Sequence, residues 1–324
     1  MKTVHWTMMN NSGMHNVAQT MMEAEKSLGI DSYLCDPFAK VDFSGIYDAD
    51  IHIGHTHIPD NIRKLATKPY KRVSVIHGGF EHVFQTSVET GINGGYGAGD
   101  GFMLLQYLLL NSEAVVTFWP RHKWIYDRMM GKGRECDCIP LGVDLDFWKP
   151  VPSQGKYAGN PSMLSAENPH FCKWPLNLFL LWPYVFEEIP EARLHVIYMA
   201  TDQHRWFFPL INMNGAHYAS VVSPLVFAPE GLRNAFCSVD YLFASSWYGD
   251  HNRLSMEAGA SGCKVISYPG NEYADYWVTE VDQRTQFSDL LKIFKGEAEP
   301  RKKLPVPSHL DMAKEMIKIY ERVL

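Results

Sequence analysis

The stretch 241–268 constrains the fold of this 324-residue chain more than any other. It begins with the apolar run 241–244, which predicts a short buried strand before a polar turn. Asn252 is placed to cap a helix and Gly262 to end it. A second apolar run follows at 264–267. Two strands joined by one helix over so few residues predict a parallel, right-handed crossover.

This stretch resembles the signature of the family-4 retaining glycosyltransferases, in which Glu-Ala-Met-Ala-x-Gly precedes an apolar strand. The chain reads Glu-Ala-Gly-Ala-Ser-Gly from Glu257 to Gly262. Glu257 lies in a helix beside the carboxyl ends of parallel strands, where open α/β sheets bind ligands. The resemblance implies that its carboxylate accepts hydrogen bonds from the nucleotide ribose. The alternative is a solvent-facing glutamate near a helix start, with no role in binding.

The resemblance also implies a site for the donor diphosphate. An uncapped helix start carries partial positive charge, so the backbone N–H groups of His251, Asn252 and Arg253 are expected to face that diphosphate. The family's first Glu, which contacts the donor sugar, is replaced here by Gly249. Asp250, one place later, is the candidate substitute.

Two cations grip the donor diphosphate in the family, an Arg and a Lys five residues after it. Lys173 matches the Lys, whereas Asn168 stands at the Arg position. One positive charge is therefore missing from a site that must stabilise a departing nucleoside diphosphate. Arg253 and Arg233 are the candidate replacements, and a solvated surface lysine is the alternative for Lys173.

Length, charge and cysteine content favour a two-domain cytoplasmic enzyme. A chain of 324 residues exceeds one comfortable hydrophobic core. The net charge of −6 gives no basic footprint for nucleic acid or an anionic membrane. The six cysteines include no C-x-x-C pair, which predicts reduced thiols. The first residues lack the apolar core of a signal peptide, and the longest apolar run, 102–110, is too short to span a bilayer.

Short apolar segments alternate with helical patterns along the rest of the chain, which predicts parallel sheets. Strands are expected at 3–6, 33–35, 51–53, 73–76, 114–117 and 138–139, and a second series begins at 163–166. The segment 139–150 reads Ile-Pro-Leu-Gly-Val-Asp with a later Phe and Pro, and it resembles the interdomain signature of the same family.

The expected fold is therefore α/β of the GT-B type, with two Rossmann-like domains whose parallel sheets face each other across a cleft. We expect an acceptor-side domain at 1–150 and a nucleotide-sugar-binding domain at 151–306. The apolar stripe within 307–324 predicts a last helix, which in the family crosses back to the first domain.

The first domain offers fewer candidate site residues. Gly13 follows the first strand and permits close backbone approach to the diphosphate or the acceptor. His77 ends the fourth strand, where related enzymes carry a His near the donor sugar; a packed strand-end histidine is the alternative. His52, His55 and His57 are weak metal-ligand candidates, because a strand places alternate side chains on opposite faces.

The resemblance implies a nucleotide-sugar-dependent hexosyltransferase that works by front-face substitution, needs no metal or other cofactor, and uses a donor such as a UDP- or GDP-sugar. The missing Arg and first Glu keep a second reading open, a non-catalytic nucleotide- or sugar-binding relative. A sugar-nucleotide epimerase is the third reading. For the acceptor, a soluble glycan or small molecule is favoured, and a hydroxymethylated DNA base is the alternative, since a flipped base needs only a local pocket.

Overall fold

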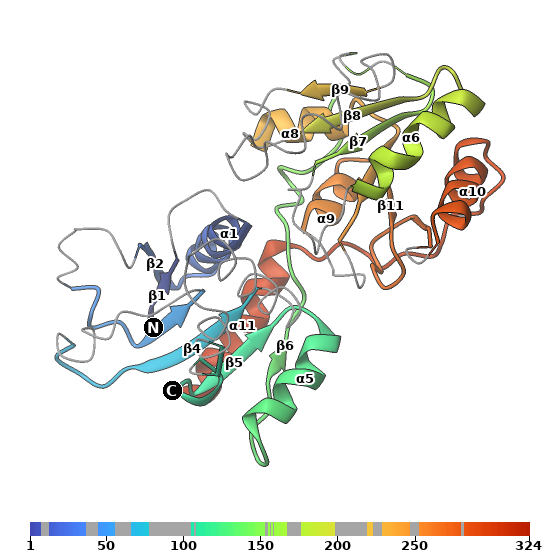
Figure 1. Ribbon diagram of the computed structural model, residues 1–324. Coiled ribbons are helices and arrows are strands. Elements are labelled where there is room, and N and C mark those ends of the chain that lie inside the picture. Colours follow the sequence, from blue (N-terminus) through green and yellow to red (C-terminus); the bar gives the residue numbers. More distant parts are fainter. Residues whose placement is uncertain are drawn as a thin grey trace, which may run out of the picture. The chain divides into compact units, whose positions relative to one another are not determined.

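The chain divides into two compact units, Met1–Asp144 with Pro307–Leu324, and Leu145–Val306 (Figure 1). The computed structural model describes residues 1–7, 13–36, 45–55, 66–77, 105–106, 108–152, 155, 157, 159–166, 176–197, 219–222, 229–246, 253–279 and 282–324. The division between the units falls inside the 139–150 signature. Each unit contains one parallel sheet with helices around it, so the predicted α/β fold of two Rossmann-like domains is confirmed.

The first unit is built on a six-stranded parallel sheet in the order β2-β1-β3-β4-β5-β6. Its strands are β1 (Lys2–Trp6), β2 (Asp31–Cys35), β3 (Ile51–Gly54), β4 (Lys71–Ile76), β5 (Ala114–Thr117) and β6 (Asp137–Cys138). The residues of β3 and β5 are buried throughout, as expected for strands covered on both faces. The chain runs from β1 to one edge and then returns to the other side of β1. The strand order therefore reverses between β1 and β3, where sheets of this kind bind ligands at their carboxyl ends.

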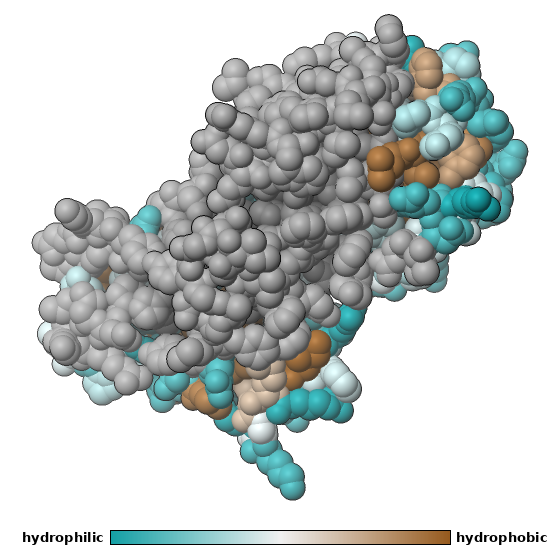
Figure 2. Space-filling model, in the orientation of Figure 1, coloured by the Kyte–Doolittle hydropathy of each residue, from teal (hydrophilic) through white to brown (hydrophobic). Residues whose placement is uncertain are grey.

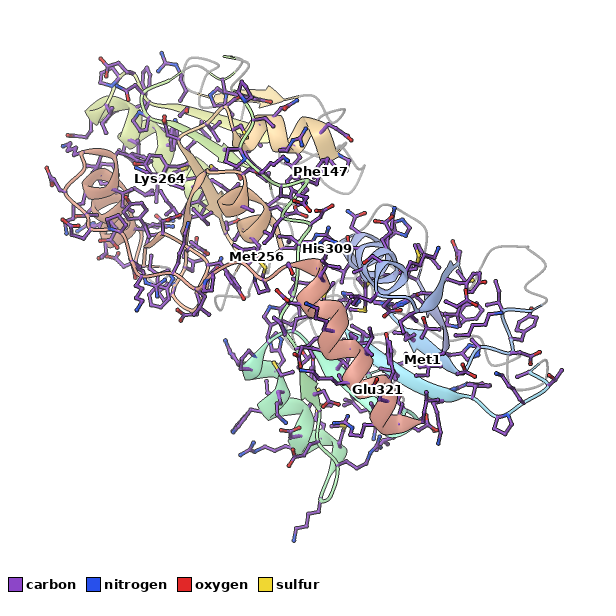
Figure 3. All side chains as sticks on the ribbon, turned by 180° about the vertical axis from the view of Figure 1, so that it is seen from behind. Met1, Phe147, Met256, Lys264, His309 and Glu321 are labelled. Carbon is purple, nitrogen blue, oxygen red and sulfur yellow. The ribbon has the colours of Figure 1, made fainter. Side chains whose placement is uncertain are left out.

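The helices of the first unit are α1 (Gly13–Ser27), α5 (Pro120–Met130) and α11 (His309–Val323). Helix α1 is followed by Gly29, whose φ of 86° suits the left-handed conformation after a helix. Helix α11 packs against α1, although almost the whole chain separates them in sequence (Figure 3). The two helices are joined by a buried hydrogen bond of 2.7 Å from Tyr320 Oη to Glu25 Oε1.

The segment that leads into α11 lies against the interdomain signature. Val143 N–H donates to Pro307 O at 3.1 Å, and His309 N–H donates to Val143 O at 2.9 Å. A Cβ on Gly142 would overlap the carbonyl oxygen of Ser308, so only glycine fits this close approach. The glycine of the signature therefore serves the contact between the signature and the returning C-terminal segment.

The second unit repeats the arrangement, with a parallel sheet in the order β12-β11-β10-β7-β8-β9. Its strands are β7 (Ser162–Ser165), β8 (Arg193–Ile197), β9 (Ala219–Val222), β10 (Tyr241–Ala244), β11 (Lys264–Ser267) and β12 (Tyr276–Trp277). Its helices are α6 (Leu176–Glu188), α8 (Pro229–Phe236), α9 (Arg253–Ala260) and α10 (Gln283–Phe294). The strand order reverses between β7 and β10, which makes their carboxyl ends the expected ligand edge of this unit.

The core of the second unit lies between its sheet and helices α6 and α10. It includes Met163 and Phe243 from the strands and Trp182 and Leu290 from the helices, all 0% exposed. On the described surface that faces the viewer in Figure 2, brown hydrophobic groups are small and lie between teal hydrophilic ones. Among the described helices, none has both the length and the hydrophobicity to cross a bilayer.

Candidate functional site

Helix α9 is the element that carries the central candidate, Glu257. It joins β10 to β11, which pair in parallel with Leu242 opposite Val265. The helix ends as its sequence predicts: Gly262 has a φ of 88°, and Cys263 N–H donates to Ala258 O at 3.0 Å. Glu257 thus lies on the helix that follows β10, at the switch point of the second sheet.

A buried asparagine fixes α9 against the strand ends. Asn271 Nδ2 donates to Ser255 Oγ at 2.9 Å and to Ser267 Oγ at 3.2 Å. Ser267 Oγ donates in turn to Ala244 O at 2.8 Å. Asn271, Ser255 and Ser267 are at most 1% exposed. This network joins the helix that carries Glu257 to the carboxyl ends of both β10 and β11.

Glu257 is a desolvated carboxyl with one ionic partner. Its side chain is 9% exposed, and Arg253 Nε lies 2.6 Å from its Oε1. Burial raises the pKa of Glu257, although the charge and hydrogen bond of Arg253 act in the opposite direction. A carboxylate has about four lone-pair sites, so the bond to Arg253 leaves room for hydroxyl donors. This chemistry suits the vicinal hydroxyls of a ribose.

Arg233, the other proposed replacement cation, is used elsewhere. Its Nη1 donates to Phe147 O at 3.0 Å, and its guanidinium lies 4.5 Å from the centre of the Phe147 ring. It therefore holds the Phe147 part of the interdomain signature against α8. Of the two arginines, only Arg253 lies on the helix that carries Glu257.

His77 lies directly after β4, at the carboxyl edge of the first sheet, and is half-buried. Its Nε2 lies 2.6 Å from His55 Nδ1, and its ring lies 5.5 Å from that of Phe118. His55 Nε2 lies 2.9 Å from Nδ1 of His5, on β1. The structure thus brings three histidines together where the strand order reverses. Gly13 is the first residue of α1, the helix that follows β1.

Sequence reasoning missed His5, Glu25 and Asn271. A signal existed for Glu25, which lies four residues after Met21 and eight after Val17, on the apolar face of its helix.

The other predicted site residues lie outside the described part of the chain, so their positions stay predictions: His57, Asn168, Lys173, Gly249, Asp250, His251 and Asn252.

Within the described part of the chain, no three or more His, Cys, Asp or Glu side chains are arranged to hold a metal ion. His52 and His55, on the same segment, have different partners. Trp6 Nε1 donates to His52 Nδ1 at 3.0 Å, whereas His55 contacts the other two histidines of the cluster. The side chains of His52 and His55 therefore make separate contacts.

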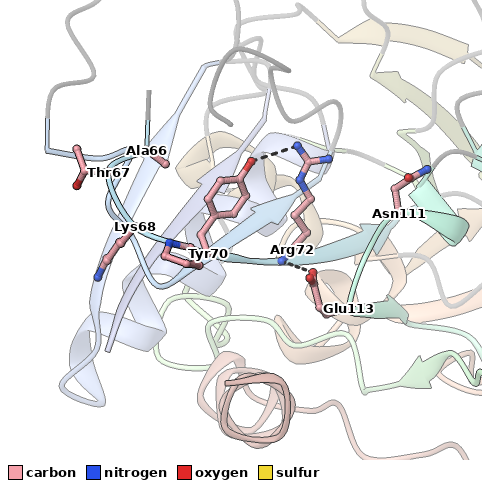
Figure 4. A pocket seen from close by; sticks show the side chains of 8 residues that line it. Ala66, Thr67, Lys68, Tyr70, Arg72, Asn111 and Glu113 are labelled. Carbon is pink, nitrogen blue, oxygen red and sulfur yellow. Dashed lines mark hydrogen bonds between the residues drawn. The ribbon is translucent and has the colours of Figure 1, made fainter. Parts of the chain in front are cut away.

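A polar cavity of about 490 Å³ lies at the opposite edge of the first sheet (Figure 4). Its lining comes from residues that precede or begin β4 and β5, including Lys68, Asn111 and Glu113. Arg72 Nη2 donates to Tyr70 Oη at 3.3 Å beside it. This edge carries the amino ends of the strands, so the cavity is separate from the His77 cluster.

Comparison with protein-family models gives no match, and comparison with curated protein sequences gives none. Solved structures match over nearly the whole chain. A sucrose-phosphate synthase from Thermosynechococcus elongatus has a TM-score of 0.74 at 12% identity, covering 100% of this chain and 99% of the other. Anabaena HepE, in complex with UDP and glucose, has a TM-score of 0.67 at 11% identity, covering 99% and 100%. A glycosyltransferase from Rickettsia africae has a TM-score of 0.64 at 12% identity, covering 99% and 98%.

These structural neighbours are GT-B glycosyltransferases. The chain therefore has a glycosyltransferase-like α/β fold of two Rossmann-like domains. At identities of 11–12%, the similarity is one of fold.

Proposed function

We propose that this chain is a retaining glycosyltransferase that moves a hexose from a nucleoside diphosphate sugar, such as a UDP- or GDP-sugar, to an acceptor hydroxyl. The observation that carries the proposal is the placement of Glu257. A buried, hydrogen-bonding carboxyl lies on the helix after β10, at the switch point of the second sheet. The solved complexes of HepE with UDP-glucose and of other neighbours with UDP support a uridine nucleotide as the first donor to test.

The two domains have separate tasks in this proposal. Residues 151–306 bind the donor nucleotide, and Glu257 accepts hydrogen bonds from the ribose. Residues 1–150 contribute the acceptor side. Within this range, Gly13 permits close approach of the backbone to the substrates, and His77 lies near the donor sugar. The last helix, 307–324, belongs with the first domain.

The proposed reaction is a front-face substitution. The bond from the anomeric carbon to the diphosphate breaks while the acceptor oxygen bonds on the same face, and the departing phosphate oxygen takes the acceptor's proton. Lys173, with the helix-start amides of His251 and Asn252, steadies the charge on the leaving group. Asp250 contacts the donor sugar. No side-chain nucleophile is required, unlike in retaining glycosidases, and no metal ion is needed.

A second candidate is a nucleotide- or sugar-binding relative without transfer activity. Asn168 and Gly249 favour it, because they replace a cation and a carboxylate that the family uses at the donor. The acceptor we favour is a soluble glycan or small molecule, and a hydroxymethylated DNA base is the alternative.

The first experiment is thermal unfolding of the protein with UDP-, GDP- and ADP-sugars in the presence of EDTA. A ligand that binds only the native state raises stability by RT ln(1 + [L]/Kd). We expect one nucleotide to raise the Tm without metal, and donor turnover to fall strongly in Glu257→Ala and in Lys173→Ala. Donor binding without transfer or hydrolysis would leave the binding relative as the better reading. Turnover near the wild-type rate in both variants would remove the proposed mechanism.

A further inference from the structure

A continuous hydrogen-bonded chain runs from the interior of the first unit to His77. Glu25 Oε2 lies 3.0 Å from His5 Nε2, His5 Nδ1 lies 2.9 Å from His55 Nε2, and His55 Nδ1 lies 2.6 Å from His77 Nε2. His5, His55 and His77 are called the histidine chain below. It crosses β1 and the residues that follow β3 and β4, so it lies at the ligand edge of the sheet.

The inner end of the histidine chain is a buried carboxylate. Glu25 is 0% exposed and accepts hydrogen bonds from Tyr320 Oη at 2.7 Å, Ser32 Oγ at 2.8 Å and Thr3 Oγ1 at 3.0 Å. Burial alone would raise the pKa of Glu25, but the charge and hydrogen bond of His5 and the bonds from Tyr320 and Ser32 lower it below its ordinary value. The four hydrogen bonds from Tyr320, Ser32, Thr3 and His5 make Glu25 an ionised acceptor while His5 is neutral, and a charge on His5 lowers the pKa of Glu25 further.

The Glu25 carboxylate can only accept, so it fixes which nitrogen donates and which accepts in each hydrogen bond of the histidine chain. His5 Nε2–H donates to Glu25, so His5 Nδ1 must accept from His55 Nε2–H. His55 Nδ1 then accepts from His77 Nε2–H. In this neutral state Nδ1 of His77 carries no proton and is a hydrogen-bond acceptor.

One added proton reverses the donor–acceptor direction of the hydrogen bonds between the three histidines. The proton bonds to His77 Nδ1, the Nε2 proton of His77 passes to His55 Nδ1, and the Nε2 proton of His55 passes to His5 Nδ1. Only N–H bonds are made and broken, and the charge ends on His5 beside the Glu25 carboxylate. His55, in the middle of the histidine chain, does not keep the positive charge. Burial, and then the charges of the neighbouring His77 and His5, lower the pKa of His55 well below its ordinary value. In this second arrangement the proton is on His77 Nδ1, which becomes a donor.

We propose that the histidine chain is a proton relay, anchored by Glu25, that sets whether Nδ1 of His77 accepts or donates a hydrogen bond. Glu25, His5 and His55 are positioning residues that act through His77. The functional part of the inference rests on the proposed transferase, in which His77 contacts a donor-sugar hydroxyl. Besides the three histidines, the titratable groups Glu25 and Tyr320 lie at the inner end of the relay.

The test is imidazole nitrogen NMR of the full chain labelled with ¹⁵N-histidine, from about pH 8 to pH 5, where histidines titrate. We expect His77 to exchange one neutral tautomer for the other, while His5 becomes imidazolium with the same midpoint, as coupled groups do. In His55→Gln, His77 should instead become an ordinary imidazolium with its own midpoint. His52→Gln is the matched control, because His52 is a buried histidine on β3 that lies outside the histidine chain, and it should leave the tautomer exchange unchanged.

A wild-type His77 that keeps one tautomer, or that becomes imidazolium, would overturn the relay. If His55→Gln does not fold, Tyr320→Phe replaces it, because it keeps all three histidines and removes one donor from Glu25. The carboxylate then holds the His5 proton more strongly, and the shared midpoint should rise; an unchanged midpoint would also count against the relay.

The NMR experiment needs no donor, so its failure and that of the transferase proposal are separate results. With turnover established, His55→Gln should shift the midpoint of the pH profile of kcat, and His52→Gln should not. An unshifted profile in His55→Gln would mean that the relay does not act on the reaction.

Discussion

Arg253 Nε lies 2.6 Å from Glu257 Oε1, one turn apart on α9, and both side chains are largely buried. The cation that sequence reasoning placed at the diphosphate is thus engaged with the carboxylate proposed for the ribose. The pair offsets part of the cost of burying Glu257, and it ties the position of the Arg253 guanidinium to that of the carboxylate.

Glu257→Gln should weaken donor binding about tenfold or more, because a hydrogen bond to a charged acceptor contributes about 1.5–3 kcal/mol. Isothermal titration with the nucleotide identified by the thermal screen measures it. Glu230→Gln, on an exposed position of α8, is the control and should bind as the wild type does. Equal affinities in the two variants would show that Glu257 does not contact the donor.

Donor binding should also weaken on mild acidification. Burial raises the pKa of Glu257 above its ordinary value of 4.5, so the carboxylate takes up a proton at a higher pH than an exposed glutamate does. A protonated carboxyl accepts hydroxyl donors less well, and the affinity should fall as the pH approaches that raised value from above. Titrations between about pH 7.5 and pH 5 measure this fall. In Glu257→Gln the affinity should be flat over the same interval, and a parallel fall in both proteins would assign the effect to another group.

The β10–α9–β11 unit could be predicted from sequence because its signals are local. Apolar runs mark both strands, and Gly262 ends the helix through its own backbone conformation. Asn271 carries no such signal, since its bond to Ser255 depends on how a later turn packs beneath the helix. Sequence alone also left Arg233 open as a diphosphate ligand, whereas tertiary packing directs it to Phe147 O.

The histidine chain shows the same limit in the first unit. His55 and His77 could be placed at strand ends from their apolar runs, and the alternation of faces agrees with the different partners of His52 and His55. The contact between His55 and His77 could not be predicted without the order of β1, β3 and β4 in the sheet. The contact between Glu25 and Tyr320 could not be predicted either, because it depends on the packing of α11 on α1, which are far apart in the sequence.

Gly142→Ala should destabilise the first unit by about 1–3 kcal/mol, the usual cost of overpacking. The new Cβ would overlap the Ser308 carbonyl oxygen and lie 2.9 Å from His309 Cα, both backbone atoms. Gly259→Ala is the contrasting variant. Its Cβ would have only Lys303 Nζ nearby, at 3.9 Å, and alanine in a helix interior should add up to about 1 kcal/mol. Urea unfolding of both variants measures the difference, and equal midpoints would contradict the close approach at Gly142.

Glu25→Gln should cost stability at neutral pH and progressively less in acid. The pKa of Glu25 is lower in the folded protein than its ordinary value of 4.5, so its stabilisation is complete above about that pH and is lost as the pH falls through the folded value. Replacing a buried, multiply hydrogen-bonded carboxylate should cost about 2 kcal/mol or more at pH 7. Glu23→Gln, an exposed position on the same helix, is the control and should change little at any pH. Urea unfolding of the three proteins at pH 7 and near pH 4 gives the comparison. A deficit in Glu25→Gln that is the same at both pH values would mean that the loss comes from packing and not from the ionised carboxylate that anchors the histidine chain.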